Sequence, residues 1–125
     1  MDIKDFKTKT KLCFHHIKDM YGVEDIENMI SEYLTYICQE NFLHDIKILE
    51  ILIGGSRCRG KEKESSDLDI IIFYDGDIRE DDFFNILSKE SFYLEDILVD
   101  FNPIQTDNVC LSEYLISVET YLEEN

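Results

Sequence analysis

Apolar residues form three short runs after residue 45, at positions 46–53, 68–74 and 97–101. Runs of this length bounded by glycine or polar turns are typical of buried strands. A different pattern occupies residues 24–40, where large apolar residues recur every three or four positions. That spacing predicts an amphipathic helix, with acidic residues in its first turn and Tyr21-Gly22 as the break before it.

The other predicted elements rest on local signals. Residues 6–15 are ambiguous. Their lysines alternate with other residues as in a strand, whereas their apolar residues have the spacing of a helix, and we interpret them as a helix. Asp77 to Glu80 resemble a capping box for a helix that ends near Lys89. Pro103 is expected to end the third strand, because proline lacks an N–H donor. A last helix is expected over residues 112–123.

This order of elements predicts one α+β domain over residues 1–125, in which a small mixed sheet is flanked by helices. Its helical N-terminal part spans about residues 1–44 and its core about 46–125. The sequence shows neither a membrane-spanning apolar run nor a signal peptide, so a cytoplasmic location is expected. The four cysteines lack metal-binding spacing and are expected to be free thiols.

Residues capable of phosphate and metal chemistry cluster between the first two predicted strands. Gly54-Gly55-Ser56 follows the first strand, and Asp67-Leu68-Asp69 opens the second. Side chains two positions apart on a strand share a face and lie roughly 6.5–7 Å apart, so both acids can converge on Mg²⁺. Asp100, the one polar residue of the third run, is a candidate third carboxylate. The alternative is a glycine turn with unrelated surface acids.

The spacing Gly55-Ser56, ten residues, Asp67-x-Asp69 resembles that of the polymerase-β-like nucleotidyltransferases. The likeness is to the minimal nucleotidyltransferases of bacteria and archaea in particular, and it covers residues 51–104. It implies a palm-like core and a nucleoside triphosphate as substrate. The implied triphosphate-binding residues are Gly54, Gly55, Ser56, Arg57, Arg59 and Gly60. Two Mg²⁺ ions are implied on Asp67 and Asp69, with Asp100 as third ligand and general base.

The formal net charge of −16 opposes binding to a polyanion and argues against a processive nucleic-acid polymerase. It favours a basic protein partner or a small acceptor, although solubility alone is an equally ordinary reason for acidity. Four basic residues lie in the glycine loop. For Arg57 and Arg59, phosphate binding and simple solvation are both open, whereas Lys61 and Lys63 are interpreted as solvated.

Three functions of different classes fit the pattern. The first is transfer of AMP from ATP to a hydroxyl of a protein, which the resemblance places in the setting of an antitoxin that modifies a HEPN-type toxin. The second is transfer to a small molecule such as an antibiotic, which usually requires an additional acceptor-binding domain. The third is a non-catalytic module that acts by binding a partner chain or a second copy of itself. Because the sequence retains all three acids and the Gly-Ser pair, we favour a catalytically active site over a non-catalytic module.

Overall fold

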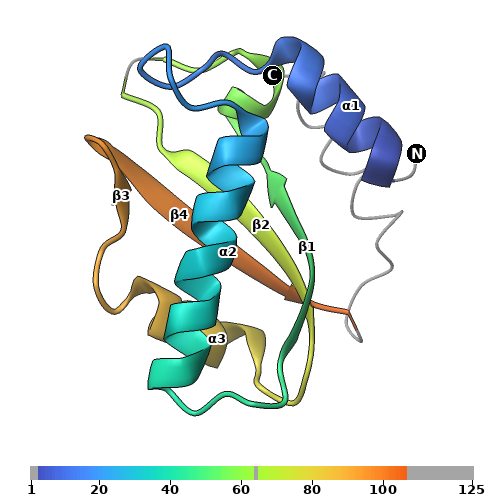
Figure 1. The fold of residues 1–125 in the computed structure, drawn as a ribbon, viewed down its shortest axis with the longest axis vertical. Helices are drawn as coiled ribbons and strands as arrows, with labels where there is room; N and C mark the ends of the chain where they lie inside the picture. Colours follow the sequence, from blue (N-terminus) through green and yellow to red (C-terminus); the bar gives the residue numbers. More distant parts are fainter. Residues whose placement is uncertain (1–2, 64, 107–125) are drawn as a thin grey trace.

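A four-stranded mixed sheet forms the centre of the fold (Figure 1). The computed structural model describes residues 3–63 and 65–106. The strand order is β1-β2-β4-β3, with β2 and β4 parallel and the other two pairs antiparallel. The described elements are α1 (Ile3–Cys13), α2 (Val23–Glu40), β1 (Lys47–Ile53), the 3₁₀ helix η1 (Ser56–Arg59), β2 (Leu68–Asp75), α3 (Glu80–Ser88), β3 (Tyr93–Leu94) and β4 (Ile97–Gln105). The predicted α+β class, a small mixed sheet flanked by helices, is confirmed.

Helices α2 and α3 cover one face of the sheet (Figure 1). The Tyr33 ring of α2 stacks on Phe101 of β4 at 5.5 Å, and Tyr74 of β2 meets Phe83 of α3 edge to face at 4.9 Å. Side chains alternate between the faces of a strand, so Asp100, the neighbour of Phe101, points to the other face. The helices therefore fix which face of the sheet carries the carboxylates.

Helix α2 confirms the prediction from its spacing. Its apolar stripe of Ile26, Ile30, Leu34 and Ile37 is buried. The backbone N–H of Gly22 donates to the Asp25 side chain at 3.0 Å, which satisfies one polar group at the helix start.

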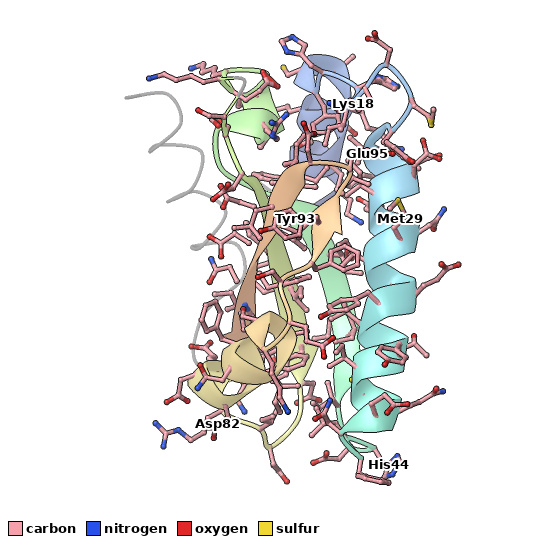
Figure 2. All side chains as sticks on the ribbon, turned by 90° about the vertical axis from the view of Figure 1, so that its left-hand side faces the viewer. Lys18, Met29, His44, Asp82, Tyr93 and Glu95 are labelled. Carbon is pink, nitrogen blue, oxygen red and sulfur yellow. The ribbon has the colours of Figure 1, made fainter. Side chains whose placement is uncertain are left out.

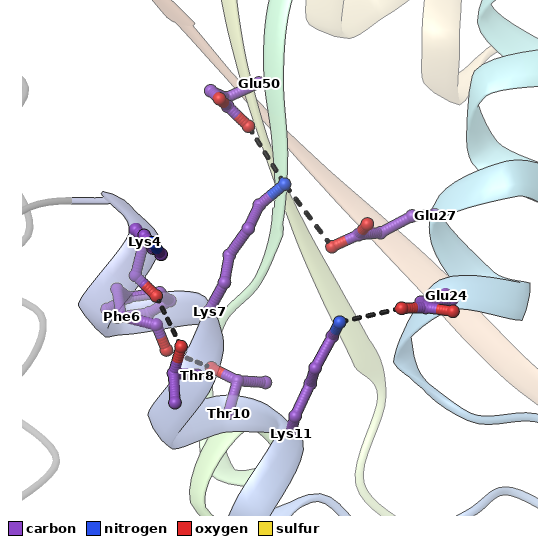
Figure 3. Close-up of polar contacts among 9 residues, drawn as sticks. All are labelled: Lys4, Phe6, Lys7, Thr8, Thr10, Lys11, Glu24, Glu27 and Glu50. Atoms are coloured by element: carbon purple, nitrogen blue, oxygen red, sulfur yellow. Dashed lines mark hydrogen bonds and ion pairs between the residues drawn. The ribbon is translucent and has the colours of Figure 1, made fainter.

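Helix α1 confirms the helical interpretation of the ambiguous N-terminal segment, although it ends at Cys13 rather than His15. Phe6 and Thr10 are buried, and the hydroxyl of Thr10 donates to the carbonyl of Phe6. Two of its lysines form ion pairs with acidic residues of other elements (Figure 3). Lys7 lies 3.0 Å from Glu50 of β1, and Lys11 lies 2.7 Å from Glu24 of α2. These pairs tie α1 to two other elements.

Two local predictions do not match the structure, and one short strand was not predicted. Pro103 does not end its strand, because β4 continues to Gln105. In the described part of the chain, β3 pairs only with Ile97 and Leu98, so Pro103 has a neighbouring strand on the β2 side alone. A strand with one neighbour tolerates a proline, because the missing N–H need not serve a second strand. The short strand β3 was not predicted at all.

The predicted capping box at Asp77 to Glu80 is also wrong. Helix α3 begins at Glu80 with Arg79 as its N-cap and without a side-chain capping bond. The carboxylate of Glu80 instead accepts from the backbone N–H of Gln105 at 2.7 Å, which joins α3 to the end of β4. The helix expected over residues 112–123 lies outside the described residues. No described helix is both long enough and apolar enough to cross a bilayer.

Removing the hydroxyl of Tyr74 tests how the segment leading into α3 is attached to the sheet. The hydroxyl donates to the carbonyl of Ile78 at 2.7 Å, and the residue is fully buried. We expect Tyr74→Phe to keep the ring packing but to lower the free energy of unfolding by about 1 kcal/mol, because the carbonyl loses its donor. Urea denaturation measures the change. Tyr36→Phe, at an exposed position, is the matched control and should leave the midpoint unchanged.

Candidate active site

Asp69 and Asp100 are brought together by the parallel pairing of β2 and β4. The two residues are partners in the register of these strands, which puts their side chains on the same face of the sheet. Asp69 is partly buried. Burial raises the pKa of its carboxyl to about 6, helped by the negative charge of Asp100, the hydrogen bond with it and the charge of Asp67. The pair is therefore a crowded carboxylate site that favours a positive charge.

Asp67 lies just before β2 and is exposed, as is Asp100. The intervening Leu68 is fully buried. Among residues 3–63 and 65–106, no three His, Cys, Asp or Glu side chains are already arranged to hold a metal ion. The donor set nevertheless fits a hard divalent cation, because carboxylate oxygens are its preferred ligands and a cation would relieve the repulsion that raises the pKa of Asp69.

The glycine loop begins directly against Asp69. The backbone N–H of Gly54 donates to the carbonyl of Asp69 at 2.9 Å. Gly55 has φ 63° and ψ −159°, a conformation essentially restricted to glycine. A Cβ at Gly55 would also collide with the carboxylate oxygen Oδ2 of Asp69. The sequence thus uses glycine here so that the backbone can approach the carboxylate, and Ser56 follows at once as the first residue of η1.

Ser66, which the motif analysis did not single out, holds the loop closed. Its carbonyl accepts two hydrogen bonds from the guanidinium of Arg57, from Nη2 at 2.8 Å and from Nε at 3.3 Å. Its hydroxyl accepts from the backbone N–H of Lys63 at 2.9 Å and lies 3.4 Å from the hydroxyl of Ser56. A serine beside an Asp-x-Asp pair carries no sequence signal for this role, because the bonds arise only once the loop has folded back.

The basic residues of the loop have structural contacts. Arg57 is buried and braces the loop through Ser66. The guanidinium of Arg59 lies over the Phe6 ring of α1 at 5.3 Å from its centroid. Gly60 is left-handed at φ 68°, and a Cβ there would collide with the carbonyl of Cys13. Cys58 is buried, with its sulfur 3.6 Å from the hydroxyl oxygen of Thr10 in α1.

The predicted site residues therefore fall into two groups. Gly54 and Gly55 lie against Asp69, and Ser56 comes next in the chain with its hydroxyl 3.4 Å from that of Ser66. Arg57, Arg59 and Gly60 contact Ser66 or α1, which supports the loop from behind. A site of this kind combines carboxylates that suit a cation with a backbone turn that suits an anion, which is the chemistry of a metal-bound phosphate.

Gly55→Ala tests the close approach of the loop to Asp69. We expect it to lower the free energy of unfolding by roughly 1–3 kcal/mol, because the added methyl requires a disfavoured backbone conformation and displaces the carboxylate. Gly54→Ala is the comparison and should cost less, since its methyl would displace only the terminal Cδ1 of Ile71, 2.8 Å away, and Gly54 has no positive φ. Equal destabilisation of the two variants, measured by urea denaturation, would contradict this geometry.

The carboxyl of Asp69 should titrate near pH 6 in the metal-free protein, as followed by carboxyl NMR. Asp100→Asn should lower this pKa without returning it to 3.8, because burial is the largest cause of the shift. Since the pKa is raised in the folded state, the contribution of Asp69 to stability is full below about pH 3.8 and is lost as the pH rises through 6. Asp75→Asn, at the exposed end of β2, should leave the titration unchanged.

Comparison with known proteins agrees with this chemistry. The family described as "Polymerase beta, Nucleotidyltransferase" matches residues 32–122, a range that includes the glycine loop and all three acids. No curated protein and no solved structure matches the chain. The family match spans well over half of the sequence and encloses the sheet on which the site is built. The chain therefore belongs to the polymerase-β nucleotidyltransferase family.

Proposed function

We propose that this protein transfers a nucleoside monophosphate, most simply AMP from ATP, to a hydroxyl group and releases pyrophosphate. The observation that carries the proposal is the contact of Gly55 with the carboxylate of Asp69, which is itself paired with Asp100. This contact brings together a backbone turn of the kind that binds phosphate and a pair of carboxylates of the kind that binds a divalent cation. Family membership supports nucleotidyl transfer in general.

The reaction forms a bond between the acceptor oxygen and the α-phosphorus and breaks the bond to the β-phosphate oxygen. Asp67, Asp69 and Asp100 are the residues that would hold one or two Mg²⁺ ions, which supply charge neutralisation at the α-phosphate and at the leaving pyrophosphate. Asp100, exposed at the surface of the pair, would take the proton of the acceptor hydroxyl. The electron pair of the broken bond leaves with pyrophosphate.

The loop residues would bind the rest of the nucleotide. Ser56 and the backbone amides around it, at the start of η1, would hold the β- and γ-phosphates. Arg57 supports this loop by its two bonds to the carbonyl of Ser66. A loop already fixed by such bonds loses less conformational freedom when a triphosphate binds, so its geometry need not form at the moment of reaction.

A protein hydroxyl is the acceptor we favour. The formal charge of −16 disfavours a nucleic-acid acceptor, because two polyanions repel. The resemblance to minimal nucleotidyltransferases points the same way, to an antitoxin that modifies a HEPN-type toxin.

Calorimetric titration with ATP and the other nucleoside triphosphates, with and without Mg²⁺, tests the nucleotide site. We expect Mg²⁺-dependent binding that Asp69→Asn and Asp100→Asn each weaken at least tenfold, because each removes one carboxylate from the cation. Asp75→Asn is the matched control and should bind as the wild type does. Unchanged affinity in both site variants, with folding verified by urea denaturation, would overturn the proposal.

Transfer itself is followed with ATP labelled at the α- or the γ-phosphate. Incubation with a candidate acceptor protein should attach the α label and leave the γ label in pyrophosphate. Attachment of the γ label would indicate phosphoryl transfer instead and would contradict nucleotidyl transfer.

A further inference from the structure

A groove of about 320 Å³ lies on the outer side of α2, away from the sheet. It is lined by Met20, Tyr21, Asp25, Asn28, Met29 and Glu32, and we call it the methionine groove. The chain has three methionines, and the two that follow Met1 are both in this lining. Methionine is flexible and polarisable, and it is over-used at surfaces that adapt to a partner.

The loop that forms one wall of the groove holds Met20 out in the solvent. Lys18 and Asp19 are both left-handed, with φ 56° and 54°, a conformation that residues with side chains rarely adopt in succession. The backbones of Ile17 and Tyr21 are paired across this turn, and Met20 at its end is 65% exposed. A flexible methionine side chain held at the surface by this turn is available to contact a partner.

Two further contacts fix this wall to the turn between β3 and β4. The hydroxyl of Tyr21 donates to Glu95 at 3.1 Å, and Lys18 forms an ion pair with Asp96 at 3.1 Å. Figure 2 shows Lys18 and Glu95 near each other at the top of this side of the molecule, with Met29 further along α2. The groove is therefore largely formed before any partner binds, which reduces the ordering needed on association.

The charges around the groove are of one sign. Among residues 3–63 and 65–106, its lining includes the carboxylates of Asp25 and Glu32 and no basic side chain. Helix α2 contains no lysine, arginine or histidine in any of its 18 residues. Lys18, the nearest basic residue of the wall, is paired with Asp96. A groove lined by methionine and tyrosine side chains together with carboxylates is complementary to a helix that carries apolar residues on one side and Lys or Arg beside them.

We propose that the methionine groove docks a basic amphipathic helix of a protein partner. Apolar side chains of that helix would contact Met20 and Met29, while its cations would approach Asp25 and Glu32. An anionic membrane surface is repelled by the same carboxylates, which leaves a protein segment as the occupant. The groove is on the outer side of α2, whereas Asp69 and Asp100 are on the sheet face turned from α2, so docking leaves the carboxylates uncovered. The proposal does not depend on nucleotidyl transfer.

Methionine-methyl NMR of the full chain tests the docking directly. The probe is a synthetic helical peptide with leucines at helical spacing and lysines at the other positions. We expect it to shift the Met20 and Met29 methyl signals, assigned through Met20→Leu and Met29→Leu, and to leave that of Met1 in place. The same peptide with glutamate in place of lysine should shift none of the three.

Charge-reversal variants separate docking from general attraction to an acidic protein. Glu32→Lys should weaken binding of the lysine peptide at least tenfold. Glu40→Lys changes the net charge equally on the same helix but outside the groove, and it should weaken binding less than threefold. Leu12→Ser, at an 82% exposed position on α1, should bind as the wild type does, whereas Met20→Ser should not. Equal losses in Glu32→Lys and Glu40→Lys, or unshifted Met20 and Met29 signals, would overturn the proposal.

Discussion

The parallel pairing of β2 with β4 is the constraint on which the rest of the site depends. It aligns Asp69 with Asp100 in register, and a slip of one residue would move one of the two side chains to the helix-covered face. The register is in turn fixed by burial, since Phe101 stacks on Tyr33 and Tyr74 packs on Phe83. Apolar packing on one face thus determines the electrostatics of the other, and it holds two like charges closer than they would remain in solution.

The glycine loop adds a second layer of support to this pairing. Gly54 bonds to the backbone of Asp69, and the far end of the loop is closed by Arg57 on Ser66. Helix α1 supports it from outside, through Phe6 beneath Arg59 and through Cys13 against Gly60. Helix α1 is itself tied to α2 and β1 by lysine pairs (Figure 3). The N-terminal helix, which precedes the family match at residues 32–122, therefore contributes to the geometry of the loop.

The parts of the structure that sequence predicted are those governed by local pattern. Apolar periodicity located α2 and the three long strands, and the motif spacing located the loop beside Asp69. What sequence missed depends on contacts between distant segments. Glu80 looked like half of a capping box, but its carboxylate binds the backbone of Gln105. For Arg57, phosphate binding and solvation were both open predictions. Its burial and its hydrogen bond to Ser66 form only in the folded loop, so composition could not indicate them.

Pro103 has a consequence for how this protein behaves at high concentration. It lies in β4 beyond the two residues that β3 covers, so in the described chain this stretch has a strand on one side only. An exposed strand edge is a template on which other chains can add. A proline there offers no N–H, so an incoming strand cannot complete its ladder. Pro103 is itself buried and Gln105 already donates its N–H to Glu80 of α3, so neither residue offers an N–H to another chain.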